Sequence, residues 1–143
     1  MFYYLFLFVD GSIRMIDHTG FSVTNLEGSK IFYMRVLACL GHVARLEIPA
    51  RAVGFGPAQP DEGSDPGGAF WITQGTPSTP RMHIAFTAKN KEEVEAFHST
   101  ALQIGGKDNG APGYRPQYHP GYYASFILDP DGYNIEAVYH ERK

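Results

Sequence analysis

Three side chains of this sequence could perform chemistry at a defined site: His18, His83 and Glu136. Glu136 is the one carboxylate in the run YNIEAVYH, from Tyr133 to His140. Imidazole and carboxylate groups are suitable ligands for divalent Fe, Mn, Zn or Ni. Histidines also pack in protein cores with ordinary hydrogen bonds, and a strand glutamate can simply face solvent. The residue types alone therefore leave a metal site and a structural role open.

His18 and His83 occupy equivalent positions in an internal repeat. With an offset of 65, MIDHTGFSVTNLEGSKIFYMRVLACLG, from Met15, aligns without a gap with PRMHIAFTAKNKEEVEAFHSTALQIGG, from Pro80. The other matched pairs are Phe21 with Phe86, Asn25 with Asn90, Phe32 with Phe97, Leu37 with Leu102 and Gly41 with Gly106. Because these pairs extend over a predicted strand, turn and helix, the sequence predicts a duplicated unit.

Each copy should place its histidine on a strand that precedes a helix. The first segment of each copy alternates as a strand does, and an amphipathic stripe marks the following helix: Val94, Phe97, His98, Ala101 and Leu102 in the second copy. Gly41 and Gly106 are expected to end the helices. Further strands are predicted at 42–48, 52–56, 69–73, 122–128 and 133–140. The turn DPDG, from Asp129, joins the last two as a hairpin.

Two glycine-rich and proline-rich segments complete the chain, Gly56 to Gly68 and Lys107 to Gly121. They are too long for simple turns, and long ordered loops in compact domains often serve as lids or binding loops. We therefore expect both segments to be loops.

Composition limits the partners and the location. At 143 residues the chain fits one globular domain, and a net charge of -3 offers no basic surface for nucleic acid or anionic membrane. The single cysteine, Cys39, excludes an intramolecular disulfide and indicates the reducing cytoplasm. The apolar segment 1–14 is expected to be an N-terminal extension or an added edge strand, because it lacks signal-peptide features and is too short to span a bilayer.

The order of elements, with the motifs MIDHTGFSV, MHIAF and DPDGYNIEAV, resembles the glyoxalase/bleomycin-resistance/extradiol-dioxygenase superfamily, also called vicinal oxygen chelate. The resemblance covers Met15 to Glu141. It implies an α+β fold in residues 15–143, made of two tandem βαβββ modules, about 15–76 and 80–143, which form a curved mixed sheet around a central cavity. It also implies a small-molecule substrate or ligand and suggests a homodimer.

In the metal-using members of that family, ligands come from the first and last strands of each module. Carried over to this chain, the pattern assigns His18, His83 and Glu136 to one divalent ion. Three protein ligands leave positions for water or a chelating substrate. Such a metal acts as a Lewis acid on a vicinal oxygen pair, or binds dioxygen if it is redox-active.

The chain departs from the family pattern at the fourth ligand. An offset of 65 places Trp71 opposite Glu136 and an offset of 64 places Ile72 there, and neither can bind a metal. Gln74 or Thr73 could do so only with a shifted register. Glyoxalase I-like members use a carboxylate or similar ligand at this point, which argues against lactoylglutathione lyase activity. Ring-cleaving dioxygenases and fosfomycin-resistance-like proteins manage with three ligands.

Two functions therefore stand as alternatives. The first is a metal-assisted lyase, isomerase or dioxygenase, in which Glu136 is joined by His119 and Tyr123 as candidate acid or base groups. The second is a metal-free binding protein of the bleomycin-resistance type, since the indole of Trp71 offers a stacking wall rather than a ligand atom. A protein of the same fold with a closed pocket is a third interpretation.

Several other residues are candidates for contact with the substrate or ligand. The aromatic side chains expected to line the pocket or its back wall are Phe70, Trp71, Tyr122, Tyr123 and Phe126. Arg115 belongs to a segment that could close over the pocket and bring a positive charge to an anionic group. For each of these residues, packing or solvent exposure is the alternative.

Overall fold

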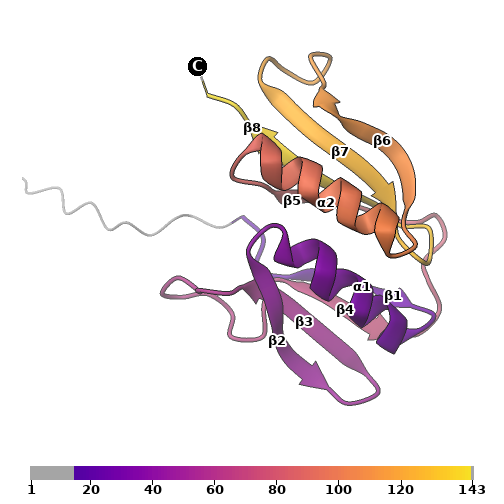
Figure 1. Ribbon diagram of the computed structural model, residues 1–143. Coiled ribbons are helices and arrows are strands. Elements are labelled where there is room, and N and C mark those ends of the chain that lie inside the picture. The colour runs from indigo at the N-terminus through magenta and orange to yellow at the C-terminus, as the bar shows by residue number, and fades with distance from the viewer. Residues whose placement is uncertain (1–14, 143) are drawn as a thin grey trace, which may run out of the picture.

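The computed structural model describes residues 15–142, so the predicted extension, residues 1–14, lies outside the described part of the chain. The elements follow the order expected for a duplicated unit (Figure 1). The first module contains β1 (Thr19–Val23), α1 (Leu26–Ala38), β2 (His42–Ile48), β3 (Ala52–Pro57) and β4 (Phe70–Gln74). The second contains β5 (His83–Thr87), α2 (Lys91–Gln103), β6 (Lys107–Tyr114), β7 (Tyr122–Leu128) and β8 (Asn134–His140). The predicted α+β fold of two βαβββ modules is confirmed.

The described strands form two four-stranded sheets and no closed barrel. Their orders are β1-β4-β3-β2 and β5-β8-β7-β6, and the first and last strands of each module are parallel neighbours. Gly20 pairs with Trp71 in the first sheet, and Ala85 pairs with Glu136 in the second. Because both members of the second pair follow the first by 65 positions, the structural counterpart of Glu136 is Trp71 and not Ile72.

Each helix is preceded by an asparagine, and the internal repeat aligns these two asparagines with each other. The side chain of Asn25 accepts a hydrogen bond from Gly28 N at 3.0 Å, and that of Asn90 accepts one from Glu93 N at 2.8 Å. Both residues are N-caps, which satisfy backbone N–H groups that lack a partner within the helix. Neither described helix has the length and apolar character needed to cross a membrane.

Each helix covers one face of its own sheet. In β8 the alternation places Ile135 and Ala137, both fully buried, on the side of α2. Val94, Phe97 and Ala101 of α2 are also fully buried. We call the opposite surface of each sheet its free face. Glu136 lies on the free face of the second sheet, since it alternates with the buried residues of β8.

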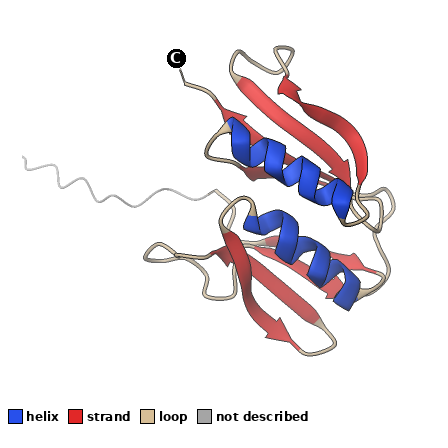
Figure 2. Ribbon diagram, in the orientation of Figure 1, coloured by secondary structure: helices blue, strands red, loops and turns tan. Residues whose placement is uncertain are grey.

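The two modules contact each other through their helix-covered faces. The rings of Phe21 and Tyr133 stack with centroids 3.7 Å apart, and the Tyr133 hydroxyl donates to Ser22 O at 2.7 Å. The buried hydroxyl of Tyr33 donates to Asp129 at 2.5 Å. Figure 2 shows α1 and α2 next to each other at the centre of the molecule, and the two helices are in contact. One hydrophobic core therefore serves both modules, and the free faces lie outside this contact.

Three local predictions need correction. The segment from Lys107, expected to be a loop, begins with strand β6, whose pairing with β7 is interrupted on both sides of Gly110. These irregularities removed the alternation by which a strand is recognised. The left-handed residue after α2 is Gly105, with φ 99°, and not Gly106. Leu102, assigned to the buried stripe of the helix, is 42% exposed.

Replacing Tyr133 by phenylalanine should weaken the junction between the modules. The ring stack would remain, but Ser22 O and Ser78 N would each lose the hydroxyl that they contact. Leaving such groups without a partner costs about 1–3 kcal/mol of unfolding free energy, measurable by urea denaturation. The matched control is Tyr114→Phe, because that hydroxyl bonds Glu141 at the surface; its loss should stay below about 0.5 kcal/mol. Equal losses in the two variants would contradict the junction role.

Candidate functional site

Glu136 is a buried carboxylate with a partner on each oxygen. The residue is 2% exposed. Its Oε2 lies 3.0 Å from His83 Nε2, and its Oε1 accepts a hydrogen bond of 2.5 Å from the Tyr122 hydroxyl. A buried carboxylate must be compensated in this way, because removing the charge from water is costly.

The sheet register explains why these side chains meet. His83 begins β5 and pairs with Asn134, two residues before Glu136 on β8. Phe126 of β7 lies directly opposite Glu136, and Tyr122 precedes Phe126 by two alternations on the same face. Side chains two positions apart share one face of a strand. We call His83, Tyr122, Phe126 and Glu136 the Glu136 cluster.

The two ring nitrogens of His83 both face oxygen acceptors. Nδ1 lies 2.9 Å from the Asn134 carbonyl oxygen, and Nε2 lies 3.0 Å from the Glu136 carboxylate. If Nδ1 carries the proton that the carbonyl accepts, then the lone pair of Nε2 points at a carboxylate oxygen. A nitrogen lone pair and a carboxylate oxygen repel each other at this distance, so a proton or a metal cation must lie between them. A backbone carbonyl that fixes the imidazole in this way is also the usual arrangement behind a metal-binding histidine.

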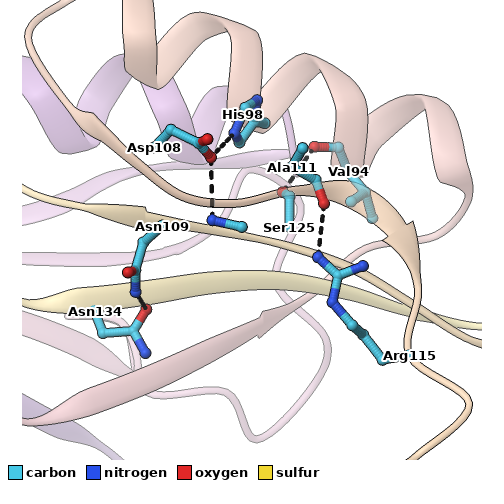
Figure 3. Close-up of polar contacts among 9 residues, drawn as sticks. Val94, His98, Asp108, Asn109, Ala111, Arg115, Ser125 and Asn134 are labelled. Carbon is cyan, nitrogen blue, oxygen red and sulfur yellow. Dashed lines mark hydrogen bonds and ion pairs between the residues drawn. The ribbon is translucent and has the colours of Figure 1, made fainter.

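Neighbouring residues hold the cluster in position. The Asn109 amide donates to the Asn134 side chain at 3.1 Å, which ties β6 to the strand that carries Glu136 (Figure 3). Arg115 donates to Ala111 O at 2.6 Å, also drawn in Figure 3, and its guanidinium lies 5.5 Å from the centre of the Phe126 ring. The Phe126 ring stacks in turn against His83, with centroids 6.1 Å apart. A fixed positive charge therefore lies at the edge of the cluster.

Tyr122 is the partner that sequence reasoning assigned only to the pocket wall. Burial raises the pKa of the Tyr122 phenol most strongly, and the hydrogen bond to Glu136 raises it further. The hydroxyl therefore stays protonated and remains a donor over the whole neutral range. The alternation of β7 was the available signal, because Tyr122 lies an even number of positions from Phe126.

His119 and Tyr123, the two candidate acid or base groups, lie in different places. Tyr123 points to the helix-covered side, where its hydroxyl donates to Glu95 of α2 at 2.9 Å. His119 contacts the cluster through its ring, whose centre lies 5.2 Å from that of Tyr122. Its Nε2 lies 3.1 Å from Nδ1 of His140. Of the two residues, only His119 lies beside the cluster.

His18 forms a different group of potential ligands. Its Nδ1 lies 2.6 Å from the Asp17 carboxylate, a hydrogen bond that raises the pKa of this exposed imidazole. Potential ligand atoms of Asp17, His18 and Asp65 lie within 4.8 Å of one another. Within the described residues this is the one set of three His, Cys, Asp or Glu side chains close enough to share an ion. His18 is therefore not assembled with His83 and Glu136 inside one chain.

Two aromatic residues that were expected to line one pocket, Phe70 and Trp71, lie on opposite faces of the first sheet. Trp71 lies on the free face of the first sheet, where its Nε1 donates to Gly68 O at 2.9 Å. Phe70 belongs to the core instead, with 5% exposure and ring contacts to Phe21 and Tyr33. Adjacent strand positions point to opposite faces, so these two residues could not both line the same surface.

Most of this chain matches the model of one protein family. Residues 15–137 match the family model of the Glyoxalase/Bleomycin resistance protein/Dioxygenase superfamily. The chain belongs to this superfamily. A search of curated proteins finds no match. The family assignment fits the duplicated βαβββ architecture. The fold does not determine the chemistry, which depends on the residues of the site.

Solved structures of the superfamily share the fold. A glyoxalase/bleomycin resistance protein from Albidiferax ferrireducens T118 is 27% identical, with a TM-score of 0.69 over 87% of this chain and 98% of that one. A fosfomycin resistance protein from Listeria monocytogenes, complexed with Mn(II) and a dihydroxypropylphosphonic acid, is 19% identical, with a TM-score of 0.63 over 88% and 90%. Lactoylglutathione lyase from Agrobacterium tumefaciens is 20% identical, with a TM-score of 0.59 over 86% and 91%.

The phenol of Tyr122 should titrate at higher pH than free tyrosine. In Glu136→Gln its pKa should fall but stay raised, because burial is the larger cause and persists in the variant. Carbon-13 NMR of labelled tyrosine, with the resonance assigned by Tyr122→Phe, measures both values. A titration at the ordinary tyrosine pKa in the unmodified chain would disprove the short contact with Glu136.

Proposed function

We propose that this superfamily member is a metal-dependent enzyme that acts on a small oxygenated substrate. The observation that carries the proposal is the pair His83 Nε2 and Glu136 Oε2, 3.0 Å apart, with the imidazole held from behind by the Asn134 carbonyl. Imidazole and carboxylate together suit Mn, Fe, Zn or Ni. His83 and Glu136 would hold such an ion, and its contribution would be Lewis acidity toward a pair of substrate oxygens.

We further propose that the third ligand, His18, comes from a second copy of the chain. Within one chain His18 lies with Asp17 and Asp65 in the first module. The two modules contact each other through their helix-covered faces, so their free faces do not meet within one chain. The free face of the first module also exposes Val43, Leu46 and Ile48 of β2, at 40%, 48% and 42%. Their partners on β3 include Gly54, the neighbour of Trp71. An apolar sheet face of this kind favours burial against another surface.

The chain's own residues would orient the substrate and control a proton. The protonated Tyr122 hydroxyl donates to Glu136 and so fixes the carboxylate oxygen that faces away from His83. Arg115, fixed over Phe126, would attract an anionic group of the substrate. His119, whose ring centre lies 5.2 Å from that of Tyr122, would be the group that exchanges a proton with a substrate bound over the cluster. The reaction class would be lyase, isomerase or dioxygenase chemistry.

Removing a proposed ligand should abolish metal binding. In untagged protein, His83→Ala and Glu136→Ala should each weaken Mn(II) binding about 100-fold or more, since even supporting residues of metal sites contribute 10–100-fold. Calorimetry and metal analysis measure the loss. The control is His98→Gln, a histidine of the helix-covered face that bonds Asp108. If Asp65→Asn weakened binding and Glu136→Ala did not, the ion would belong to the Asp17, His18 and Asp65 group and the proposal would fail.

Mixing two inactive variants tests the contribution of the second copy. His18→Ala and His83→Ala should each lack the complete site. If the site is shared, mixed dimers contain one intact site, so an equal mixture that has exchanged subunits should recover about a quarter of the Mn(II) sites. If both histidines came from one chain, no site would be restored. Native mass spectrometry of the mixture confirms that subunits have exchanged and counts the bound ions.

A metal-free binding protein is the second candidate function. Two observations favour it: Glu136 already has a partner on each oxygen, and Trp71 occupies the position of a fourth ligand. In that case His83 and Glu136 would share a proton, and flat ligands would stack on the exposed aromatic rings. Ligand affinity that is unchanged by a chelator, in protein that takes up no metal, would select this function over the first.

A further inference from the structure

A pocket lies between the two modules, on the helix-covered side and separate from the Glu136 cluster. It has a volume of about 310 Å³ and a largely apolar lining that includes Ile16, Leu37, His42, Phe55, Phe70 and Phe86. This volume is at the lower end of the range for small-molecule sites. None of the four residues of the Glu136 cluster lines it.

The internal repeat shows what occupies the equivalent space in the other half of the molecule. Phe86 is the counterpart of Phe21, on which the Tyr133 ring stacks at 3.7 Å with an angle of 13°. Ile16 is the counterpart of Arg81, whose guanidinium lies 5.6 Å from the centre of the same Tyr133 ring. The pocket is therefore the counterpart of the site that the phenol of Tyr133 fills.

The counterpart of Tyr133 itself is Gly68, which brings no ring into the pocket. A side chain at Gly68 is excluded, because φ is +93° and a Cβ atom would lie 2.2 Å from Phe55 O. The backbone before β4 packs directly against β3 at this point. Phe86 is only partly buried, and its ring lies in a T-shaped arrangement with that of Phe70, with centroids 5.1 Å apart.

His42 and Asp17 are the polar side chains in the lining of this pocket, and His42 is the one with a buried polar atom. Its Nδ1 is buried and has no hydrogen-bond partner among the described residues. Burial lowers the pKa of the imidazole, and a hydrogen bond with the Gly56 backbone raises it more weakly. The ring is therefore neutral at pH 7, and a buried polar atom without a partner is stabilised by any ligand that supplies one.

We propose that the pocket between the modules binds a small planar aromatic molecule carrying a hydroxyl or ring N–H group. Its ring would stack on Phe86 and its polar group would hydrogen-bond to His42 Nδ1. Tyr133 provides the internal precedent, since its ring stacks on Phe21 and its hydroxyl donates to Ser22 O. Such a site could take ligand independently of the Glu136 cluster.

The test uses 4-methylphenol, the side-chain analogue of tyrosine, with the full chain. Two-dimensional NMR titration should show saturable binding with a dissociation constant of about a millimolar, as expected for a ligand of this size. The shifted resonances should be those of Phe86, His42 and Leu37. In His42→Phe, binding should weaken about five- to tenfold for 4-methylphenol and remain unchanged for toluene, which has no group to donate.

A variant that fills the pocket separates loss of binding from loss of folding. Leu37→Phe adds a ring at a position that is 1% exposed, so it should abolish 4-methylphenol binding while the melting temperature is kept or raised. Glu136→Gln should leave the affinity unchanged. The proposal is overturned if 4-methylphenol does not saturate, if its shifts centre on the Glu136 cluster, or if Leu37→Phe folds and still binds it.

Discussion

Each module has a single helix to cover a sheet with two faces. The alternation of a strand divides its residues equally between those faces, so burying Ile135 and Ala137 under α2 necessarily presents Glu136 on the other side. The two modules then join through the faces that carry the helices, with Tyr133 stacked on Phe21 at the junction. The Glu136 cluster is consequently placed on a surface that the hydrophobic core does not cover.

The Glu136 cluster shows how such a surface can hold a buried charge. The carboxylate is shielded by its neighbours on β5 and β7, and each oxygen has a partner, so the site is stable as it stands. The same contacts would suit the proposed cation, because His83 is already held by a backbone carbonyl. The two candidate functions thus differ in whether a metal ion or a proton lies between His83 Nε2 and Glu136 Oε2. The surrounding protein structure would be nearly the same in both cases.

Much of this architecture could be predicted from the sequence because the chain is duplicated. The offset of 65 paired the two asparagines that the structure shows as N-caps and located both first strands, and the turn at Asp129 located the last hairpin. His83 and Glu136, which belong to the same module, lie 3.0 Å apart in the structure. The position of His18 depends on how whole modules pack, which no local pattern encodes.

Other differences have local causes. Strand β6 was missed because bulges near Gly110 interrupt the period of two. Tyr122 and Tyr123 are adjacent and chemically identical, so only the register with β8 reveals that the first one meets Glu136. Phe70 was placed beside Trp71 in the pocket, although neighbouring strand residues face opposite ways.

The setting of Trp71 limits which side chains position 71 could carry. The indole lies close over glycine backbone, since a Cβ atom added at Gly54 or Gly67 would approach its six-membered ring to 2.7 Å. Replacing Trp71 by Asp or Glu would therefore leave empty space over the backbone of Gly54 and Gly67. Because neither glycine has a side chain, the new carboxylate would lack side-chain packing on that side. Gly54 could not take a side chain in compensation, because a Cβ atom there would also lie 2.1 Å from Gly67 O. A metal ligand at position 71 would therefore have only backbone atoms of Gly54 and Gly67 beneath it.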